Sequence, residues 1–167
     1  MRPAIVARRT RFGDWEGDTV EGAKGKGAIA SLVERKSRYL AAAPLSDKSA
    51  ATMTSEANGA LKRVPPALRK TLTVDNGKEF AGFKAIEAQT GLSVYFADPY
   101  SAWQRGSNEN TNGLLRQYFP KGSDLSCLSR SELASAVKRL NHRPRKCLGY
   151  RTPHEVLSNA IRGALQT

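Results

Sequence analysis

Hydrophobic and polar positions along the chain divide it into short apolar runs separated by turn sequences. Five runs have the length and apolar content of strands, and we expect them at residues 15–21, 28–34, 38–44, 72–74 and 92–96. Helical spacing predicts one helix that starts within 46–49 and ends at 63, and further helices at 83–89 and 108–119. A last helix has Ser129 or Ser131 as its N-cap and runs to 142. Residues 1–12 carry neither a helix start signal nor a core pattern, so we expect a basic, extended lead-in before a core domain over residues 13–160.

The order of these elements predicts the fold class. Glycine-rich and polar turns join the first three strands, which indicates an antiparallel meander. The later strands alternate with helices, an order that is typical of an α/β domain. We therefore expect an α/β fold with a five-stranded mixed sheet, three antiparallel strands followed by parallel ones, and helices on its faces.

Charge is the main departure of this chain from an ordinary globular composition. The 27 Lys and Arg residues outnumber the 15 Asp and Glu residues, which gives a net charge of +12. Four Arg and no acid occupy residues 1–11, and nine basic residues stand against two acids over residues 116–151. Such an excess favours a polyanionic partner such as DNA or RNA, with a solubilising surface as the plainer alternative.

Cysteine content and hydropathy argue against several other classes. Two Cys residues without a Cys-x-x-Cys spacing indicate neither a zinc site nor a disulfide framework. The sequence shows no signal peptide and no run of about 20 apolar residues, so we expect a cytoplasmic protein without membrane contact.

Acidic residues on the first predicted strand are the first candidates for chemistry. Asp14, Glu16 and Asp18 share one face of that strand, because side chains alternate with a period of two. Asp18 is embedded most deeply in the apolar run, whereas Asp14 stands at the strand entry, where we expect an exposed charge. The residues alone do not choose among the three.

Two further acids lie where predicted elements meet. Asp75 directly follows a short buried strand, in an Asp-Asn-Gly sequence that is also typical of a turn. Glu109 opens a helix that carries Asn112 and Arg116 on the same face, although an acid in a first turn also fits ordinary helix-dipole chemistry. The end of the fourth strand and the start of the helix after the fifth lie at one edge of such a sheet. Carboxylates gathered there can hold divalent metal ions at a phosphodiester.

Basic and aromatic side chains near these acids are candidates for DNA contact. The loop at 100–107 contains Arg105, which can bind phosphate, and Trp103, for which stacking on a base and packing within the loop are equally expected. Sequence-independent phosphate contacts are expected from a further basic set, Arg116, Lys121, Arg143, Arg145, Lys146 and Arg151. His142 and His154 have no ligand partner at metal spacing, so we expect structural roles for them.

Seven stretches of the chain share their sequence and their order with one protein family. They are GDWEGD at 13–18, TVDNGKEF at 73–80, DPY at 98–100, WQRGSNENTNGLLR at 103–116, FPKG at 119–122, LNHRPRK at 140–146 and YRTPHE at 150–155. Through them the chain resembles the catalytic core of bacterial insertion-sequence transposases of the insertion-sequence-thirty group. More broadly it is similar to the retroviral-integrase-like, ribonuclease-H-like superfamily with an Asp-Asp-Glu triad.

This resemblance implies a ribonuclease-H-like fold, with Asp18, Asp75 and Glu109 as the catalytic and metal-binding triad. It implies two Mg²⁺ or Mn²⁺ ions in the DNA-bound state, and DNA strand cleavage and strand transfer as the reaction. Arg116 fills the basic position seven residues after the family's Glu. The implied partners are double-stranded DNA, both element ends and target, and further copies of the chain in a dimer or higher multimer on the bacterial nucleoid.

The chain departs from the family in one respect. The N-terminal helix-turn-helix region that recognises terminal inverted repeats has no counterpart in this sequence. A catalytically dormant DNA-binding remnant of a transposase is therefore an alternative. A ribonuclease H that acts on RNA–DNA hybrids is another, and the basic segment after Glu109 argues against it.

Overall fold

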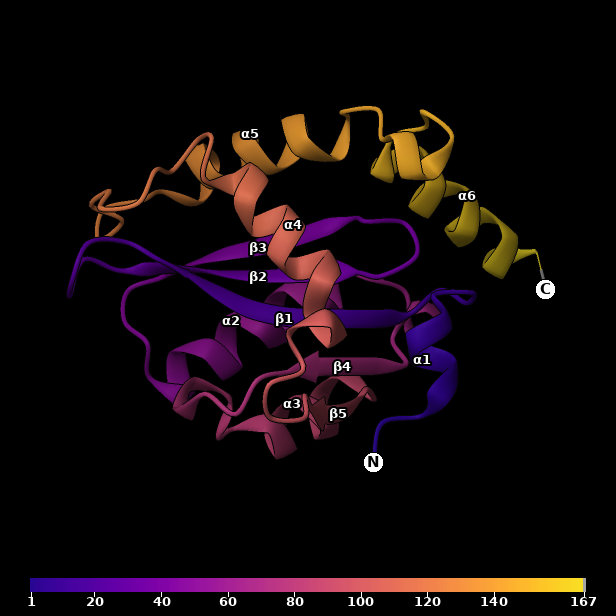
Figure 1. Cartoon of the computed structure of the whole chain (residues 1–167), viewed down its shortest axis with the longest axis horizontal. Coiled ribbons are helices and arrows are strands. Elements are labelled where there is room, and N and C mark those ends of the chain that lie inside the picture. The colour runs from indigo at the N-terminus through magenta and orange to yellow at the C-terminus, as the bar shows by residue number, and fades with distance from the viewer. Residues whose placement is uncertain (167) are drawn as a thin grey trace.

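A five-stranded sheet forms the centre of the computed structural model, which describes residues 1–166 (Figure 1). The strands stand in the order β3-β2-β1-β4-β5. Their bounds are β1 Asp14–Glu21, β2 Ala28–Glu34, β3 Leu40–Leu45, β4 Thr71–Val74 and β5 Ser93–Phe96. β1, β2 and β3 pair antiparallel, while β4 runs parallel to β1 and β5 runs parallel to β4. The predicted mixed sheet is confirmed.

Helices cover both faces of this sheet. Within residues 1–166 they are α1 Ala4–Arg8, α2 Ala50–Lys62, α3 Phe83–Thr90, α4 Gly106–Leu115, α5 Arg130–Asn141 and α6 Pro153–Leu165. Short 3₁₀ turns lie at η1 Pro66–Leu68, η2 Lys78–Phe80, η3 Ala102–Arg105 and η4 Lys146–Leu148. In Figure 1, α4 crosses in front of β1 and β2, and α5 lies along the β3 edge. None of the helices in this part of the chain has the length and apolar content to cross a bilayer.

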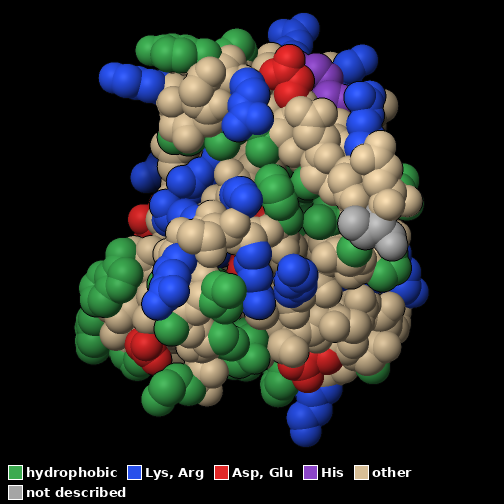
Figure 2. All heavy atoms as spheres, turned by 90° about the vertical axis from the view of Figure 1, so that its right-hand side faces the viewer, with side chains coloured by type: hydrophobic (Ala, Val, Ile, Leu, Met, Phe, Trp, Pro, Cys, Tyr) green, Lys and Arg blue, Asp and Glu red, His purple; other side chains and the backbone are tan. Residues whose placement is uncertain are grey.

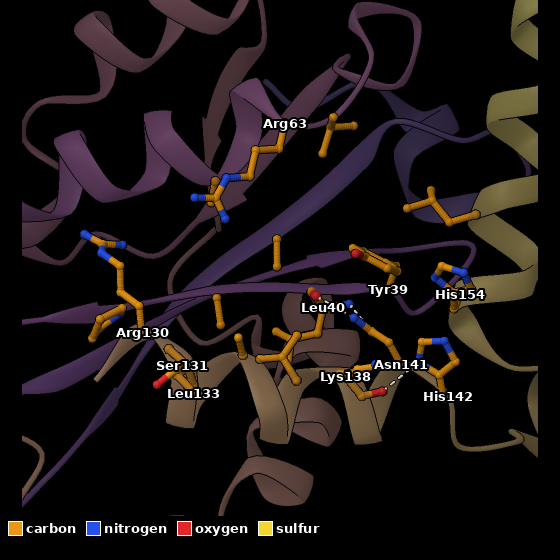
Figure 3. A pocket seen from close by; sticks show the side chains of 18 of the residues that line it. Tyr39, Leu40, Arg63, Arg130, Ser131, Leu133, Lys138, Asn141, His142 and His154 are labelled. Atoms are coloured by element: carbon orange, nitrogen blue, oxygen red, sulfur yellow. Dashed lines mark hydrogen bonds between the residues drawn. The ribbon is translucent and has the colours of Figure 1, made fainter. Parts of the chain in front are cut away.

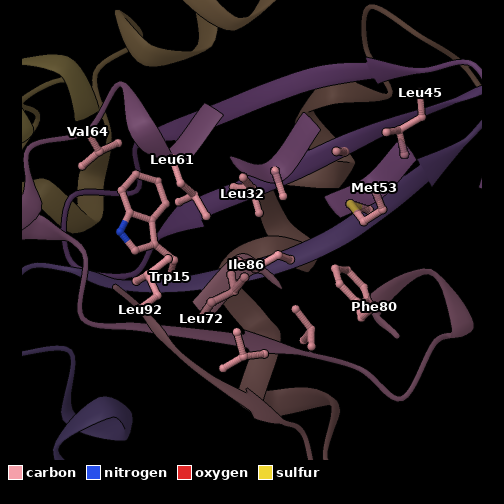
Figure 4. Packing of buried hydrophobic residues seen from close by; sticks show 14 of the residues in the cluster. Trp15, Leu32, Leu45, Met53, Leu61, Val64, Leu72, Phe80, Ile86 and Leu92 are labelled. Atoms are coloured by element: carbon pink, nitrogen blue, oxygen red, sulfur yellow. The ribbon is translucent and has the colours of Figure 1, made fainter. Parts of the chain in front are cut away.

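Alternation along β2 divides the hydrophobic core between the two faces. Ala28, Ala30 and Leu32 belong to the larger cluster, which α2 and α3 cover (Figure 4). Ile29 and Val33 belong to the second cluster, which lies under α4 and α5. Because both faces of the sheet are covered, β2 is buried along its whole length.

Trp15 is a large, fully buried side chain in the first cluster (Figure 4). Its Nε1 donates a hydrogen bond to the carbonyl oxygen of Leu68 at 2.9 Å, which satisfies the one polar atom of the buried indole. Since neighbouring side chains of a strand point to opposite faces, burial of Trp15 toward α2 turns Asp14 and Glu16 toward α4. The core thereby decides on which face of β1 the acids lie.

Both ends of the described chain are helical, which the sequence analysis did not predict. Residues 4–8 form α1 instead of an extended lead-in, and Val6 is fully buried. Residues 153–165 form α6, which begins at a capping box between Thr152 and Glu155 and carries Pro153 in its first turn. The Thr-x-x-Glu pattern was a usable signal for α6, whereas α1 has no side-chain cap.

The edge strand β3 is tied to α5 by a single side chain. The Leu40 N–H donates to Asn141 Oδ1 and Asn141 Nδ2 donates to the Leu40 carbonyl, both at 2.9 Å. The amide of Asn141 therefore completes the hydrogen bonds that a further strand would make there. Helix α5 begins at Arg130 with Ser129 as its N-cap, and the capping box with Glu132 selects Ser129 over the alternative Ser131.

Candidate active site

Parallel pairing of β1 and β4 brings two of the predicted acids together. Glu16 lies opposite Thr73 in the parallel register of β1 and β4. Two residues further along each strand direction, Asp18 therefore stands level with Asp75. A single guanidinium joins the two carboxylates. Arg105 Nη1 lies 3.1 Å from Asp18 Oδ2, and Arg105 Nη2 lies 3.6 Å from Asp75 Oδ2. The two carboxylates thus share one cation at this edge of the sheet.

Hydrogen bonds hold both carboxylate oxygens of Asp18, a predicted metal ligand. Its side chain is 20% exposed, its Oδ1 accepts from the Thr19 N–H at 2.9 Å, and its Oδ2 accepts from Asn112 Nδ2 at 3.1 Å. Burial raises the pKa of Asp18, and the charges of Asp75 and Glu79 act in the same direction. The Thr19 N–H and Arg105 oppose this shift without reversing it.

A third carboxylate, Glu79, lies beside this pair, although the Asp-Asn-Gly sequence before it is also typical of a turn. Glu79 is buried, and its Oε1 accepts a hydrogen bond from Thr19 Oγ1 at 3.3 Å. The Gly77 N–H donates to Asp75 Oδ1 at 2.9 Å, and a Cβ at Gly77 would collide with the carboxylates of both Asp75 and Glu79. The absent side chain of Gly77 therefore lets these two carboxylates approach each other. An acid four residues after Asp75, behind a glycine turn, was the signal available in the sequence.

Helix α4 contacts β1 at three points. Asn108 contacts Glu16, Asn112 contacts Asp18, and Arg116 Nη1 donates to the Glu21 carbonyl at 2.8 Å. Four helical residues rise about 6 Å and two strand residues rise about 6.6 Å, so the first two contacts are in step, whereas the long side chain of Arg116 reaches three strand residues beyond Asp18.

Glu109 belongs to the first turn of α4, one turn before Asn112. It is exposed, and its side chain makes no hydrogen bond or ion pair within residues 1–166. The helix that carries Glu109 is thus seated beside Asp18, while the Glu109 carboxylate stands apart from the pair that Arg105 bridges. No three His, Cys, Asp or Glu side chains among the described residues are grouped closely enough to hold a metal ion.

Glu16, the central acid of β1, anchors the start of α4. Its Oε2 accepts from the Asn108 N–H at 2.7 Å, and its Oε1 lies 2.9 Å from Arg35 Nη1. Arg35 Nη1 also donates to the Gln104 carbonyl at 2.8 Å. Burial raises the pKa of Glu16, against the lowering effects of Arg35 and the Asn108 N–H. Glu16 is fully buried, so its charge depends on these partners.

Asp14 corrects one expectation, since it is fully buried instead of exposed. Arg11 donates to both of its carboxylate oxygens at 2.9 Å, and Thr71 Oγ1 donates to Oδ1 at 2.8 Å. The bidentate pair with Arg11 and the bond to β4 explain how a charge is tolerated there. Asp14 therefore joins β1 to β4 and is not available to a ligand.

Most of the predicted phosphate-binding residues hold protein groups in this structure. Arg116 bonds the Glu21 carbonyl, Arg143 bonds Gln117 Oε1 at 3.0 Å and Tyr118 Oη at 3.2 Å, and Arg145 Nη2 donates to the Leu140 carbonyl at 3.1 Å. Within this predicted set, the exposed side chains that make no hydrogen bond or ion pair in residues 1–166 are those of Lys121 and Lys146. DNA contact by this set stays a prediction.

Aromatic side chains of the 99–105 loop face solvent. Trp103 is 72% exposed and Tyr100 is fully exposed, so the packing alternative for Trp103 does not hold in this structure. Tyr100 also has a positive φ of 60°, a backbone conformation that a bulky residue rarely adopts. The loop therefore presents two aromatic rings beside Arg105.

A separate cavity of about 680 Å³ lies between β3, α2, α5 and α6. Figure 3 shows the rings of His142 and His154 beside each other at one end of it, and their centroids are 4.5 Å apart. No Asp or Glu lines this cavity, so it offers no carboxylate ligands for a metal ion.

Sequence comparison defines the family of this chain. Residues 9–102 match the integrase core domain, and the chain belongs to that family. It is 46% identical over 161 residues to the transposase for insertion sequence element IS1086 of Cupriavidus metallidurans, covering 96% of this chain and 48% of the relative. It is 44% identical over 160 residues to the transposase InsI for insertion sequence element IS30A of Escherichia coli, covering 96% of this chain and 42% of the relative. The resemblance to this group of transposases is confirmed, and the chain spans less than half the length of these relatives.

Comparison with solved structures confirms the ribonuclease-H-like fold. The catalytic core domain of BIV integrase superposes with a TM-score of 0.69 at 20% identity, covering 93% of this chain and 99% of that one. A chain of the simian T-cell lymphotropic virus intasome, in complex with the PP2A regulatory subunit B56 gamma, gives a TM-score of 0.70 at 21% identity, covering 88% of this chain and 56% of that one.

The role of Glu16 predicts a large loss of stability in Glu16→Ala. Removal of the carboxylate leaves the buried Arg35 and the Asn108 N–H without their partner, and we expect a loss of about 3 kcal/mol in the free energy of unfolding. Urea denaturation measures it. Glu21→Ala, an exposed acid on the same strand, serves as the control and is expected to change little. Equal losses in the two variants would contradict the anchoring role.

Because the pKa of Asp18 is raised, Asp18→Asn is expected to stabilise the folded protein, whereas Glu16→Ala is expected to destabilise it. The folded protein binds a proton at Asp18 more tightly than the unfolded chain, so the stability contribution of this carboxyl falls as pH rises through the window above the ordinary Asp pKa. Without metal, the variant is therefore expected to melt a few degrees above wild type at neutral pH. This gain should vanish as pH falls below about 4.

Thermal melting across pH measures this difference, and Asp124→Asn is the matched control. Asp124 is an exposed acid whose pKa is lowered by hydrogen bonds from Ser126, so its substitution should give no gain at neutral pH. A melting temperature of Asp18→Asn at or below that of wild type at neutral pH would show that the carboxylate is stabilising.

Proposed function

We propose that this domain is the catalytic core of a DNA transposase, which cleaves a DNA strand and joins the freed 3′-hydroxyl to target DNA with the help of divalent metal ions. Membership of the integrase core family and the names of the relatives support this function. The observation that carries it is the convergence of Asp18 and Asp75 on one cation, the guanidinium of Arg105.

The donor set fits a hard divalent cation. Carboxylate oxygens are the ligands that Mg²⁺ and Mn²⁺ prefer, and we propose Asp18, Asp75 and Glu109 for this role. Arg105 now supplies the positive charge between the two aspartates, so its side chain has to leave before an ion can bind both. The unpaired carboxylate of Glu109 lies on the helix whose Asn112 already holds Asp18, which supports its inclusion in this set.

Bound ions of this kind lower the pKa of a water or a 3′-hydroxyl and stabilise the leaving oxygen of an in-line displacement. Residues of this chain hold the proposed ligands in position for that reaction. Asn112 fixes the Oδ2 atom of Asp18 by donating a hydrogen bond to it. The raised pKa of Asp18 makes protons compete with metal, so metal affinity should fall at low pH. Once displaced, Arg105 becomes a free guanidinium beside the phosphate, which it can bind through paired hydrogen bonds.

The net charge of +12 supports DNA as the substrate. Work on element ends and target DNA would involve further copies of the chain, since two ends have to be joined in one complex. This activity would place the protein on chromosomal DNA in the bacterial cytoplasm.

The proposal predicts that Asp75→Asn abolishes strand cleavage while DNA affinity stays equal or rises, because a negative charge near the phosphates is removed. A labelled DNA duplex with Mg²⁺ or Mn²⁺ measures nicking on a gel, and fluorescence anisotropy of the same duplex measures binding. Asp124→Asn is the matched control, since it removes the same charge from an exposed turn and should nick like wild type.

Weaker DNA binding by a folded Asp75→Asn protein would contradict the proposed position of this carboxylate. Binding of duplex by wild type without any metal-dependent nicking would support the dormant remnant instead. Preference for an RNA–DNA hybrid over duplex DNA would point to a ribonuclease H.

A further inference from the structure

A basic pocket lies at the end of the sheet where β1 begins. Four segments line this cavity of about 840 Å³: the residues after α1, the turn between β2 and β3, the η4 region, and α6. Its charged lining residues are all cationic, namely Arg9, Arg35, Lys36, Arg38 and Arg151. Figure 2 shows this end of the molecule, where Lys and Arg side chains gather across the middle of the face. We call these five residues and the cavity between them the basic pocket.

Two arginines of the basic pocket, Arg9 and Arg35, each have a buried nitrogen without a hydrogen-bond partner in the described chain. Arg35 is only 2% exposed, and its Nε atom has no hydrogen-bond partner within the described chain. The Nε atom of Arg9 is also buried without a partner, and its guanidinium makes no ion pair in residues 1–166. Glu16 is the carboxylate that pairs with Arg35, and it lies outside the lining of the cavity. Buried donors left without acceptors are unfavourable, and here both belong to guanidiniums that line the cavity, where an anion would add acceptors and a compensating negative charge.

Repulsion among the cations points in the same direction. The pKa of Arg9 is lowered by burial and then by the charge of Arg38. The pKa of Arg35 is lowered by burial, which Glu16 partly offsets, and the charges of Arg9 and Arg2 add to the lowering. A negative charge between these guanidiniums would reduce their mutual repulsion.

The basic pocket and the acidic site are connected through the segment at 104–107. Arg35 donates to the Gln104 carbonyl and Arg38 donates to Ser107 Oγ, while Arg105 between them reaches Asp18 and Asp75. Glu16 and Asp18 are two residues apart on β1, about 7 Å along the strand. The pocket and the carboxylates are therefore neighbours on either side of one short segment.

We propose that the basic pocket binds a backbone phosphate of the DNA strand whose neighbouring phosphate reacts at Asp18 and Asp75. This inference rests on the proposed transposase function and adds a substrate-positioning site to it. Guanidinium groups match phosphate oxygens with paired hydrogen bonds, which suits Arg9 and Arg35 better than a contact with a base. The site would hold DNA in register without reading its sequence.

Neighbouring arginines provide a matched test. Arg9 lines the pocket, whereas the adjacent Arg8 is exposed and does not. In anisotropy titrations of a labelled duplex at several salt concentrations, Arg9→Gln should weaken binding about ten-fold and reduce the salt slope by about one. Arg8→Gln, with the same loss of charge, should stay close to wild type. Arg151→Gln on the pocket and Arg162→Gln outside it form a second pair, in case Arg9→Gln fails to fold.

Cysteine alkylation distinguishes a DNA phosphate from a free anion. Cys147 lines the pocket and Cys127 does not, and both thiols are exposed and free. Bound duplex should slow the reaction of Cys147 with iodoacetamide more than that of Cys127, whereas inorganic phosphate should leave both rates unchanged. Protection of Cys147 by inorganic phosphate, together with wild-type DNA affinity in Arg9→Gln, would overturn the proposal in favour of a free-anion site.

Failure of this inference can be told apart from failure of the proposed function. If wild type binds duplex but the Arg9 and Arg8 variants bind it equally, the pocket holds no phosphate and the inference alone is overturned. If wild type does not bind duplex at all, the transposase function itself is contradicted.

Discussion

One buried carboxylate, that of Glu16, determines how helix α4 meets the sheet. A charge without solvent is unfavourable unless it is paired, and here Arg35 and the first turn of α4 provide the partners through the Asn108 N–H. Polar side chains make the contact between α4 and the sheet at these positions. The Ser31 hydroxyl lies 2.9 Å from the side-chain oxygen of Asn108 and 2.8 Å from that of Asn112. Apolar contacts would tolerate a shift of the helix, whereas these directional bonds fix its register, and with it the side chains that face the acids of β1.

The second constraint follows from the charges that this register brings together. Asp18, Asp75 and Glu79 crowd one edge of the sheet, and without a counter-charge their repulsion would oppose folding. Arg105 supplies that charge from a loop whose neighbouring residues are held by other arginines. Under the proposed function, the same guanidinium that stabilises the metal-free domain would compete with the proposed metal ions. The net charge of +12 would then attract DNA to a site whose own acids would repel it.

Local patterns predict much of this fold, because strand alternation, turn sequences and the cap at Ser129 act over a few residues. The same alternation places three acids of β1 on one face. Which of them is buried could not be predicted, since burial depends on partners far along the chain, as with Asp14 and its bond from Thr71. Glu79 lies in a 3₁₀ turn at the site, and no hydrophobic periodicity in the sequence predicts such a short turn. The capping box before Glu155 shows that α6 could have been predicted, whereas α1 is held by burial of one side chain.

Calorimetric titration with Mn²⁺ tests the central claim, that the Asp18–Asp75 pair is a cation site which Arg105 now fills. Wild type, Asp75→Asn and Arg105→Gln are compared, with Arg139→Gln on the exposed face of α5 as the control for charge. We expect wild type to bind Mn²⁺, Asp75→Asn to lose this binding, and Arg105→Gln to bind more tightly than either wild type or the control. Affinity in a folded Arg105→Gln protein that equals or falls below that of wild type would contradict this claim.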